Sequence, residues 1–486
     1  MNATGTLPRA ESPWAERVAT ALADEEMRRS IARTTRNFDR ARRAVYAEYP
    51  EAETMRQAGR DAKAYAIAHL DEMLTQLQSQ VEAHGGHLFC AATPDQANDY
   101  VLQVARRRGV KRVIKSKSMV TEETGLNAYL EAAGLHVRET DLGEYIIQLA
   151  HEHPSHILAP AAHKNRGQIS KLFHEEAGAR AAEPPRSEET QELAAFARQQ
   201  LRTEFLQADM GVSGGNFLVA ETGTLVLISN EGNGRMVTSL PPVHVALVGI
   251  EKVIPTWRDL GNILQQAALS GTGQRMSVYV SLVTGPRHAG ELDGPEEFHL
   301  VLLDNGRSAL RGTEYEDVLR CIRCGACLNT CPVYRNIGGH AYGTTYSGPV
   351  GAVLTPLLAG TAFMPELPKS ACSLCNACVE ACPMEIDLPR HFISLRRELV
   401  ESKQERWLLA STYRAWSNLW ARPGGYRRSV QLARLAQPFL IRDGMIKKGP
   451  GIAGGWTATR DMPPVARTTF HEWWTQRGGQ GSGERL

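Results

Sequence analysis

One cysteine pattern occurs twice in this chain, and it constrains the fold more than any other feature. The pattern C-x2-C-x2-C-x3-C-P covers Cys321, Cys324, Cys327, Cys331 and Pro332, and again Cys372, Cys375, Cys378, Cys382 and Pro383. It is the bacterial-ferredoxin run for [4Fe-4S] clusters, in which three cysteines bind one cluster and the fourth crosses over to the other. The pair of runs predicts two clusters, close enough for electrons to pass between them.

The crossing rule assigns ligands to each cluster. Cluster one is expected to take Cys321, Cys324, Cys327 and Cys382, and cluster two is expected to take Cys372, Cys375, Cys378 and Cys331. Zinc and disulfides are the alternatives. Zinc ribbons pair two C-x2-C knuckles to make four ligands, whereas each run here offers three closely spaced thiols, a fourth after three residues, and then proline. This spacing favours iron-sulfur clusters.

Length and cysteine usage limit the class of protein. At 486 residues the chain is longer than one hydrophobic core usually supports, so two or three domains are expected. Eight of its nine cysteines belong to the two runs, and they need the thiolates of a reducing compartment. Residues 1–18 lack the charged start and apolar run of a secretory signal, and the sequence contains no apolar stretch of about 18 residues. We expect a cytoplasmic protein that does not span a membrane.

The small net charge of +2 hides a division along the chain. From Arg396 onward the sequence has 16 Lys/Arg and 7 Asp/Glu, together with six of the eight tryptophans. Basic, tryptophan-rich segments favour contact with an acidic partner or the peripheral surface of an anionic membrane. The alternative is that the tryptophans pack this tail against the cluster domain. No nucleic-acid partner is expected.

Composition and periodicity predict four regions. Residues 1–84 form a helical N-terminal lead-in, because the segment 11–82 is charged and amphipathic. Residues 85–304 form an α/β domain, 305–395 the cluster domain, and 396–486 the basic C-terminal region.

The α/β region begins as alternating strands and helices, which implies a largely parallel sheet covered by helices. Its first half has strands expected over 85–93 and near 135–140, a strand and its exit loop over 111–118, and helices over 94–107 and 122–133. A polar stretch over 175–188 interrupts the series, and a helix follows around 188–206. Its second half has strands expected over 216–221, 224–229, 243–250, 277–283 and 298–303, and a helix over 257–269. We expect this half to complete one mixed sheet, and a helix over 314–320 to lead into the cysteines.

Two lysines mark a candidate anion site in the α/β region. Lys115 and Lys117 follow a predicted strand and precede a predicted helix. Helix N–H groups and lysines converge there in open α/β sheets, so a carboxylate or another anion can bind. The alternative is a solvated basic loop.

For the other chemically active side chains, the sequence favours structural roles at the surface, in turns or in the core. His151, His153, His156 and His163 crowd one segment without the spacing of a helical metal motif, so surface and loop histidines are expected. Glu221 and Glu231 lie among turn glycines and are expected to face solvent, although either could serve a transferase-like site as nucleophile or base. Cys90, the ninth cysteine, is expected to pack in the core.

Several segments together resemble the lactate utilization protein B family over nearly the full length. They are KSKSMVTEETGLN, PAAHKNRGQ, AETGTLVLISNEGNGRM, TGPRHAGELDGPEEFHLVLLDNGR, the paired cysteine runs and GGWTATRDMP. The resemblance implies an α/β LUD domain with a NagB/RpiA/CoA-transferase-like fold, an α-helical ferredoxin-type domain with two [4Fe-4S] clusters, and a distinctive C-terminal region.

The resemblance also implies a function. It implies electron transfer in the oxidation of L-lactate to pyruvate, with lactate utilization proteins A and C as partners and a downstream electron acceptor. Three alternatives stay open at this point: an electron-transfer subunit for another 2-hydroxy acid such as glycolate, a LUD enzyme acting through Glu221 or Glu231, and a cluster-based sensor or scaffold.

Overall fold

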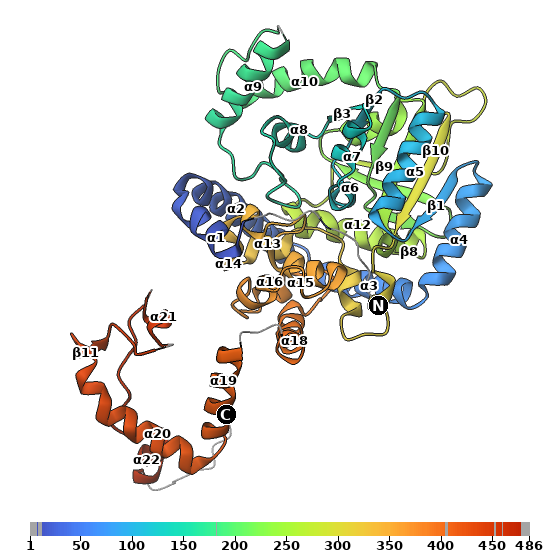
Figure 1. Ribbon diagram of the computed structural model, residues 1–486. Coiled ribbons are helices and arrows are strands. Elements are labelled where there is room, and N and C mark those ends of the chain that lie inside the picture. The colour runs from blue at the N-terminus through green and yellow to red at the C-terminus, as the bar shows by residue number, and fades with distance from the viewer. Residues whose placement is uncertain are drawn as a thin grey trace. The chain divides into compact units, whose positions relative to one another are not determined.

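The computed structural model describes residues 7, 12–180, 182–403, 407–451, 453–458 and 460–477. Contacts divide the chain into two compact units, Met1–Leu399 and Val400–Leu486. The first unit contains the six-stranded and four-stranded sheets and both cysteine runs (Figure 1). Each unit is described separately.

Four charged helices open the first unit, as the sequence predicts. They are α1 (Trp14–Ala23), α2 (Glu25–Ala47), α3 (Ala52–Ala68) and α4 (Leu70–Ala83). Asp24 caps α2 by accepting a hydrogen bond from the backbone N–H of Met27 at 2.9 Å. Ile31 and Ile67 are buried in the same hydrophobic cluster as the residues around the cysteine runs. The lead-in helices therefore share a core with the cysteine region.

A six-stranded parallel sheet forms the centre of the α/β region. Its strand order is β1 (His87–Ala91), β10 (Glu297–Leu303), β7 (Val243–Gly249), β4 (Met210–Ser213), β2 (Arg112–Lys115) and β3 (His136–Glu139). All five pairings are parallel. Strand β7 is buried along its whole length, as expected of a parallel strand covered on both faces. The expectation of a largely parallel sheet covered by helices is confirmed.

A second sheet corrects the expectation of one mixed sheet. It has four strands in the order β8 (Val253–Ile254), β5 (Phe217–Val219), β6 (Thr224–Ser229) and β9 (Tyr279–Val283), with both parallel and antiparallel pairs. The chain leaves the first sheet after β4 at Gly214 and Gly215. A Cβ atom at Gly215 would lie only 2.7 Å from Leu225 and 2.8 Å from Val248, so the backbone passes between the two sheets at a spacing that a larger residue would disturb.

Eight further helices accompany the strands in the described part of the α/β region. They are α5 (Pro94–Arg107), α6 (Met119–Thr124), α7 (Leu126–Ala132), α8 (Leu142–Leu149), α9 (Arg166–Arg180), α10 (Thr190–Leu206) and α12 (Trp257–Thr272), and a short α11 (Asn233–Ser239) follows β6. Helix α5 lies across the sheet next to β1 and β10 (Figure 1). The helix expected over 122–133 is divided by Gly125, which adopts a left-handed conformation with φ 65°. The interruption expected from residue 175 begins later, because α9 continues to Arg180.

Cys90 does not pack in the core, and that expectation was wrong. It lies in β1, the edge strand of the six-stranded sheet, and it is exposed. An edge strand has a neighbour on one side only, so a side chain that an inner strand would bury can remain accessible.

Short helices surround the cysteine runs. They are η2 (Ser308–Leu310), η3 (Glu316–Arg320), α13 (Ala326–Thr330), α14 (Pro332–Ile337), η4 (His340–Tyr342), α15 (Gly348–Ala359), α16 (Glu366–Ser370), α17 (Ala377–Ala381) and α18 (Leu388–Glu401). The helix expected over 314–320 is the 3-10 helix η3.

The second unit is mostly helical. It contains α19 (Trp407–Trp420), α20 (Pro423–Ala436), η5 (Gln437–Phe439), β11 (Ile441–Arg442), β12 (Met445–Ile446), α21 (Ala453–Thr457) and α22 (Phe470–Gln476). Large aromatic side chains are exposed in it: Trp407, Trp416, Trp420, Trp473 and Trp474. The side chain of Trp456 lies outside the described part. Among the residues that the structure describes, no helix has the length and apolar character needed to cross a membrane.

Candidate metal centre

The first group of thiols combines both cysteine runs. One pocket is lined by Cys321, Cys324 and Cys327 of the first run together with Cys382 of the second. In addition to burial, the neighbouring Cys382 raises the pKa of Cys324, and the neighbouring Cys321 raises the pKa of Cys382. The structure thus brings the fourth cysteine of the second run to the first three cysteines of the first run.

The second group has the complementary composition. Cys331 interacts electrostatically with Cys372 and Cys375, and Cys378 interacts with Cys331, Cys372 and Cys375. Cys331 is also the N-cap of α14, where its sulfur accepts a hydrogen bond from the N–H of Tyr334 at 3.5 Å. Pro332, after the first run, has a local role, because it occupies the first turn of α14, where no N–H is needed.

The two runs repeat one backbone conformation. In the first run, Arg323 and Gly325 have positive φ angles of 60° and 74°, and in the second run Leu374 and Asn376 have 57° and 62°. This conformation turns the chain back, so that the N–H of Arg323 donates to the sulfur of Cys321 at 3.4 Å and the N–H of Leu374 donates to that of Cys372 at 3.3 Å. Hydrogen bonds to cluster sulfurs help set reduction potentials. Arg323 and Leu374 are not glycines, so both runs hold a residue in a backbone conformation that side chains rarely adopt.

Burial raises the pKa of several thiols in both groups. Burial, followed by the neighbouring cysteines Cys382 and Cys321, raises the pKa of Cys324 to about 12. Burial raises the pKa of Cys378 to about 12 as well, with Cys372 and Cys331 adding to the effect. Metal binding to such thiols releases their protons, so these groups are suited to an iron-sulfur cluster.

A buried ionic network joins the first thiol group to the carboxyl edge of the parallel sheet. Glu251 lies in η1 (Ile250–Lys252), the 3-10 helix that follows β7. Its carboxylate lies 2.8 Å from Arg307 and 3.3 Å from Arg323, the residue before Cys324. Arg307 also pairs with Glu123 at 2.6 Å. The carboxyl ends of parallel strands are the usual place for ligands in open α/β sheets. Here that edge contacts the cysteine pocket.

Two buried lysines lie close enough to this pocket to interact electrostatically with Cys321. Lys63 of α3 donates to the backbone carbonyl of Val253 at 3.2 Å, and Lys252 directly follows Glu251. Burial, reinforced by Lys252, lowers the pKa of Lys63 to about 7, and burial reinforced by Arg323 lowers that of Lys252 to about 8. Cationic side chains near a cluster stabilise its negative charge, which is one means of tuning its potential.

The two lysines of the predicted anion site, Lys115 and Lys117, have different surroundings. Lys115 is 1% exposed, and its ammonium lies 2.8 Å from Glu122 and 2.7 Å from Glu139. Although burial opposes it, these two carboxylates raise the pKa of Lys115, so its charge is kept and already balanced. Register explains the contact with Glu139, because Lys115 pairs with it across β2 and β3.

Lys117 is the lysine that remains available to a ligand. Within the described residues, no hydrogen bond or ion pair of 4.0 Å or less links its ammonium to another group. Burial lowers its pKa, and the carboxylates of Asp141, Glu144 and Glu231 act in the opposite direction. Glu144 is 3% exposed and its Oε1 atom has no hydrogen-bond partner, so polar groups of both signs remain unsatisfied around Lys117.

Glu221 and Glu231 each accept a hydrogen bond from the N-terminus of a helix. Glu221 accepts a hydrogen bond from the N–H of Trp257 at 3.0 Å, at the start of α12. Glu231 accepts one from the N–H of Leu142 at 3.1 Å, at the start of α8. Both carboxylates are exposed, and each stabilises a helix N-terminus electrostatically.

The histidine segment is only partly a surface feature. His151 and His153 are exposed, as expected, but His156 and His163 are buried at 1% and 8% exposure. His156 bonds to the side chain of Asn329 in α13 at 3.1 Å. Both lie in loops, as expected, but the expectation of surface positions was wrong for these two, because helices from the cysteine region cover the segment.

Sequence reasoning missed Glu251, Arg307 and Glu123. A signal for Glu251 was present, because it directly follows a predicted strand in the same way as Lys115 and Lys117. Arg307 and Glu123 lie far apart in sequence, so only the fold reveals their pairing.

Comparison with known families agrees with this architecture. Residues 74–303 match the LUD domain, residues 317–386 match the 4Fe-4S dicluster domain, and residues 397–479 match the C-terminal domain of lactate utilisation protein B. The region with the cysteine runs is thus an iron-sulfur domain, and the α/β region is a LUD domain.

Similar proteins match this chain along nearly their whole length. The chain is 42% identical to lactate utilization protein B of Oceanobacillus iheyensis, covering 96% of this chain and 97% of that protein. It is 43% identical to proteins of the same name from Shouchella clausii and Geobacillus thermodenitrificans, in each case covering 97% of this chain and 98% of the relative. A solved DUF162 family protein from Deinococcus radiodurans covers 48% of this chain and 98% of its own at 14% identity, with a TM-score of 0.27. On the strength of the full-length relatives and the three matching domains, this chain belongs to the lactate utilization protein B family.

Proposed function

We propose that this chain is the iron-sulfur electron-transfer subunit of a system that oxidises L-lactate to pyruvate. The observation that carries the proposal is the grouping of the thiols, because each group combines three cysteines of one run with the fourth of the other. Eight thiols in two such groups suit two [4Fe-4S] clusters with crossed ligation. The name of the full-length relatives supports lactate as the substrate of the system.

The residues around the thiols support an electron-transfer role. Bound clusters would supply one-electron chemistry, and oxidation of a 2-hydroxy acid to a 2-oxo acid releases two electrons and two protons. Backbone N–H groups of Arg323 and Leu374 donate to cysteine sulfurs, and the guanidinium of Arg323 places positive charge beside the first group. These interactions favour the reduced, more negative state.

Partners and location belong to the same proposal. Lactate utilization proteins A and C would deliver electrons from lactate, and a downstream acceptor would remove them. The basic C-terminal region would dock the cytoplasmic protein onto an acidic redox partner or the inner face of the membrane.

Two other functions are less well supported. An electron-transfer subunit for glycolate or another 2-hydroxy acid would use the same thiols and differ only in substrate. A LUD enzyme working through Glu221 or Glu231 would need free carboxylates, whereas both accept hydrogen bonds from helix N-termini.

Electron paramagnetic resonance of the anaerobically purified assembly tests the proposal. The oxidised protein, with its partner proteins, is mixed with L-lactate, D-lactate or glycolate. We expect L-lactate to produce the signal of reduced [4Fe-4S] clusters, and the protein without its partners to remain oxidised. Lactate oxidation that survives removal of the clusters would instead identify a LUD enzyme, and intact clusters that stay oxidised during turnover would identify a sensor or scaffold.

A further inference from the structure

A cavity of about 410 Å³ lies in the first unit, away from the cysteine pocket. Its wall comes from α1, from the segment that contains Glu152 and His163, and from the turn that contains His340. Three side chains in this wall form a compact group: Glu152, His163 and His340.

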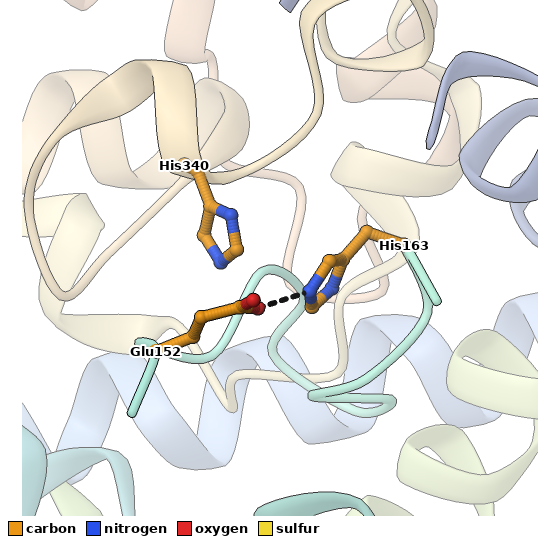
Figure 2. Close-up of side chains that lie close together, drawn as sticks. All are labelled: Glu152, His163 and His340. Carbon is orange, nitrogen blue, oxygen red and sulfur yellow. Dashed lines mark hydrogen bonds and ion pairs between the residues drawn. The ribbon is translucent and has the colours of Figure 1, made fainter. Parts of the chain in front are cut away.

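The three side chains converge on one point. One potential ligand atom from each lies within 4.8 Å of the other two. Nε2 of His163 is 2.7 Å from Oε2 of Glu152, and the two imidazole centres are 4.5 Å apart. Figure 2 shows both rings approaching the carboxylate from different segments, with a ring nitrogen of His340 directed toward it.

Neighbouring groups hold these ligand atoms in place. Nδ1 of His163 bonds to the hydroxyl of Ser155 at 2.9 Å, which leaves Nε2 facing Glu152. Lys164 donates to Oε1 of Glu152 at 2.7 Å, which leaves Oε2 for another partner. Metal-binding imidazoles and carboxylates are typically oriented by outer hydrogen bonds of this kind.

The two segments are fixed against each other by buried contacts. Tyr334 donates to the carbonyl oxygen of Ser155 at 2.5 Å, and Ser347 donates to the same oxygen at 3.3 Å. Gly339 lies so close that a Cβ atom there would overlap this carbonyl oxygen. His340 follows Gly339, and its Nε2 bonds to the carbonyl oxygen of His153 at 2.6 Å. The positions of His163 and His340 therefore depend on the fold rather than on a flexible loop.

We propose that Glu152, His163 and His340 bind one divalent transition-metal ion, separate from the iron-sulfur cysteines. Two imidazoles and one carboxylate are the ligand set of zinc sites that keep a position open for water or another ligand. Coordination through Nε2 of His340 exchanges its hydrogen bond to His153 for a bond to the metal. The open position faces the cavity, so the ion can hold a water molecule there. This inference does not depend on the proposed electron-transfer function.

Zinc binding to the anaerobically reconstituted, oxidised protein tests the inference. The protein is equilibrated with Zn²⁺, passed through a desalting column, and analysed for zinc and iron by mass spectrometry. We expect one zinc per chain in addition to the cluster iron. Extended X-ray absorption fine structure at the zinc edge should show nitrogen and oxygen ligands at about 2.0–2.1 Å, whereas zinc in a cysteine site has sulfur ligands at about 2.3 Å.

Matched variants identify the ligands. His340→Gln changes an exposed side chain and should preserve the fold, while His163→Gln and Glu152→Gln remove the other two ligands. Each should weaken zinc binding at least about tenfold, since even outer-shell changes have effects of that size, and iron content should stay unchanged. His288→Gln, an exposed imidazole outside the group, should bind zinc as the parent does. The inference is overturned if the parent retains no zinc, if the zinc has sulfur ligands, or if His340→Gln binds zinc as tightly as the parent.

Discussion

The hydroxyl of Tyr346 donates a hydrogen bond of 2.6 Å to the carboxylate of Glu123, and this bond joins the iron-sulfur domain to the LUD domain. Both side chains are almost fully buried. The same carboxylate accepts bonds from Arg307 and Asn305, so its charge is fully compensated. The two domains consequently share one buried ionic core instead of meeting across a polar surface.

Removing the hydroxyl of Tyr346 from this core should destabilise the first unit. We expect Tyr346→Phe to lower the free energy of unfolding by roughly 1.5–3 kcal/mol, the contribution of a hydrogen bond to a charged group. Glu123→Ala should cost more, about 3–5 kcal/mol, because it leaves Arg307 with less compensation in a buried site. Urea unfolding measures both changes, and Tyr65→Phe, at a half-exposed position, serves as the control. A loss no larger than that of the control would show that the bond contributes little.

Crossed ligation makes a prediction about which cysteines behave alike. Cys382→Ser should damage the same cluster as Cys321→Ser, although the two residues belong to different runs, and Cys331→Ser should resemble Cys372→Ser. Iron and sulfide should each fall from about eight to about four per chain, and the reduced variants should lose the spin coupling between clusters in their resonance spectra. Cys90→Ser should keep both clusters. If Cys382→Ser instead resembles Cys372→Ser, each run binds its own cluster.

Lys115 and Lys117 should respond differently to substitution. Lys117→Ala should weaken carboxylate binding by about ten- to hundredfold, equivalent to one charge-assisted hydrogen bond of roughly 1.5–3 kcal/mol, without changing stability or iron content. Lys115→Ala should mainly destabilise the fold, because it leaves Glu122 and Glu139 without their buried partner. Affinity for L-lactate or pyruvate and the urea midpoint distinguish these effects. If Lys117→Ala binds L-lactate and pyruvate with wild-type affinity, the segment is a basic loop and not an anion site.

His244 should make stability depend on pH. It lies in β7, fully buried, and burial together with His299 lowers its pKa to about 3. In the unfolded chain its pKa is about 6.5, so below that pH only the unfolded chain takes up the proton. The stabilising contribution is complete above pH 6.5 and decreases by up to about 1.4 kcal/mol per unit as the pH falls toward 3.

Comparison with His244→Asn isolates this contribution from acid damage elsewhere. Asparagine can still bond to Ser213, which lies 2.8 Å from Nε2 of His244. Between pH 7 and pH 5 the wild type should lose roughly 2 kcal/mol more unfolding free energy than the variant. Parallel pH profiles for the two proteins would show that His244 is charged in the fold.

The C-terminal region should be needed for docking rather than for cluster binding. All eight cysteines of the two runs precede residue 383, and the chain from Val400 forms its own compact unit. Truncation at Glu401 should therefore preserve iron content and reduction by dithionite while slowing electron transfer with partner proteins. In the full-length protein, association should weaken as salt increases. Loss of iron or unfolding after truncation would assign a structural role to the region.

Regular local patterns made much of the fold predictable from sequence. The helix over 94–107 has Pro94 in its first turn and a capping Thr93, and the strand over 224–229 has an apolar run of the right length; both occur with the predicted bounds. Strand β4 was missed because its residues adjoin two glycines that suggest a turn. The division into two sheets was missed as well, since it depends on close packing between strands that are distant in sequence.

The cysteine motifs were evident because their spacing is local, but their surroundings were not. The compensation of Lys115 arises from strand register, and the partnership of Arg307 with Glu123 and Glu251 arises from three separate segments. The group of Glu152, His163 and His340 likewise needs the turn after α14 to reach the histidine segment. Such contacts leave no periodic pattern in the sequence, so only the folded structure shows them.

The contact between Glu251 and Arg323 makes the first thiol group an internal reporter on the sheet edge. The guanidinium of Arg323 pairs with Glu251 at the sheet edge, and the backbone N–H of Arg323 donates to the sulfur of Cys321. A ligand that shifts the loop after β7 must also shift a charge beside the sulfurs, so the spectrum of a cluster bound there will change when the edge is occupied. Binding at the LUD domain can thus be followed in the unlabelled protein, by the colour and magnetism of its own iron.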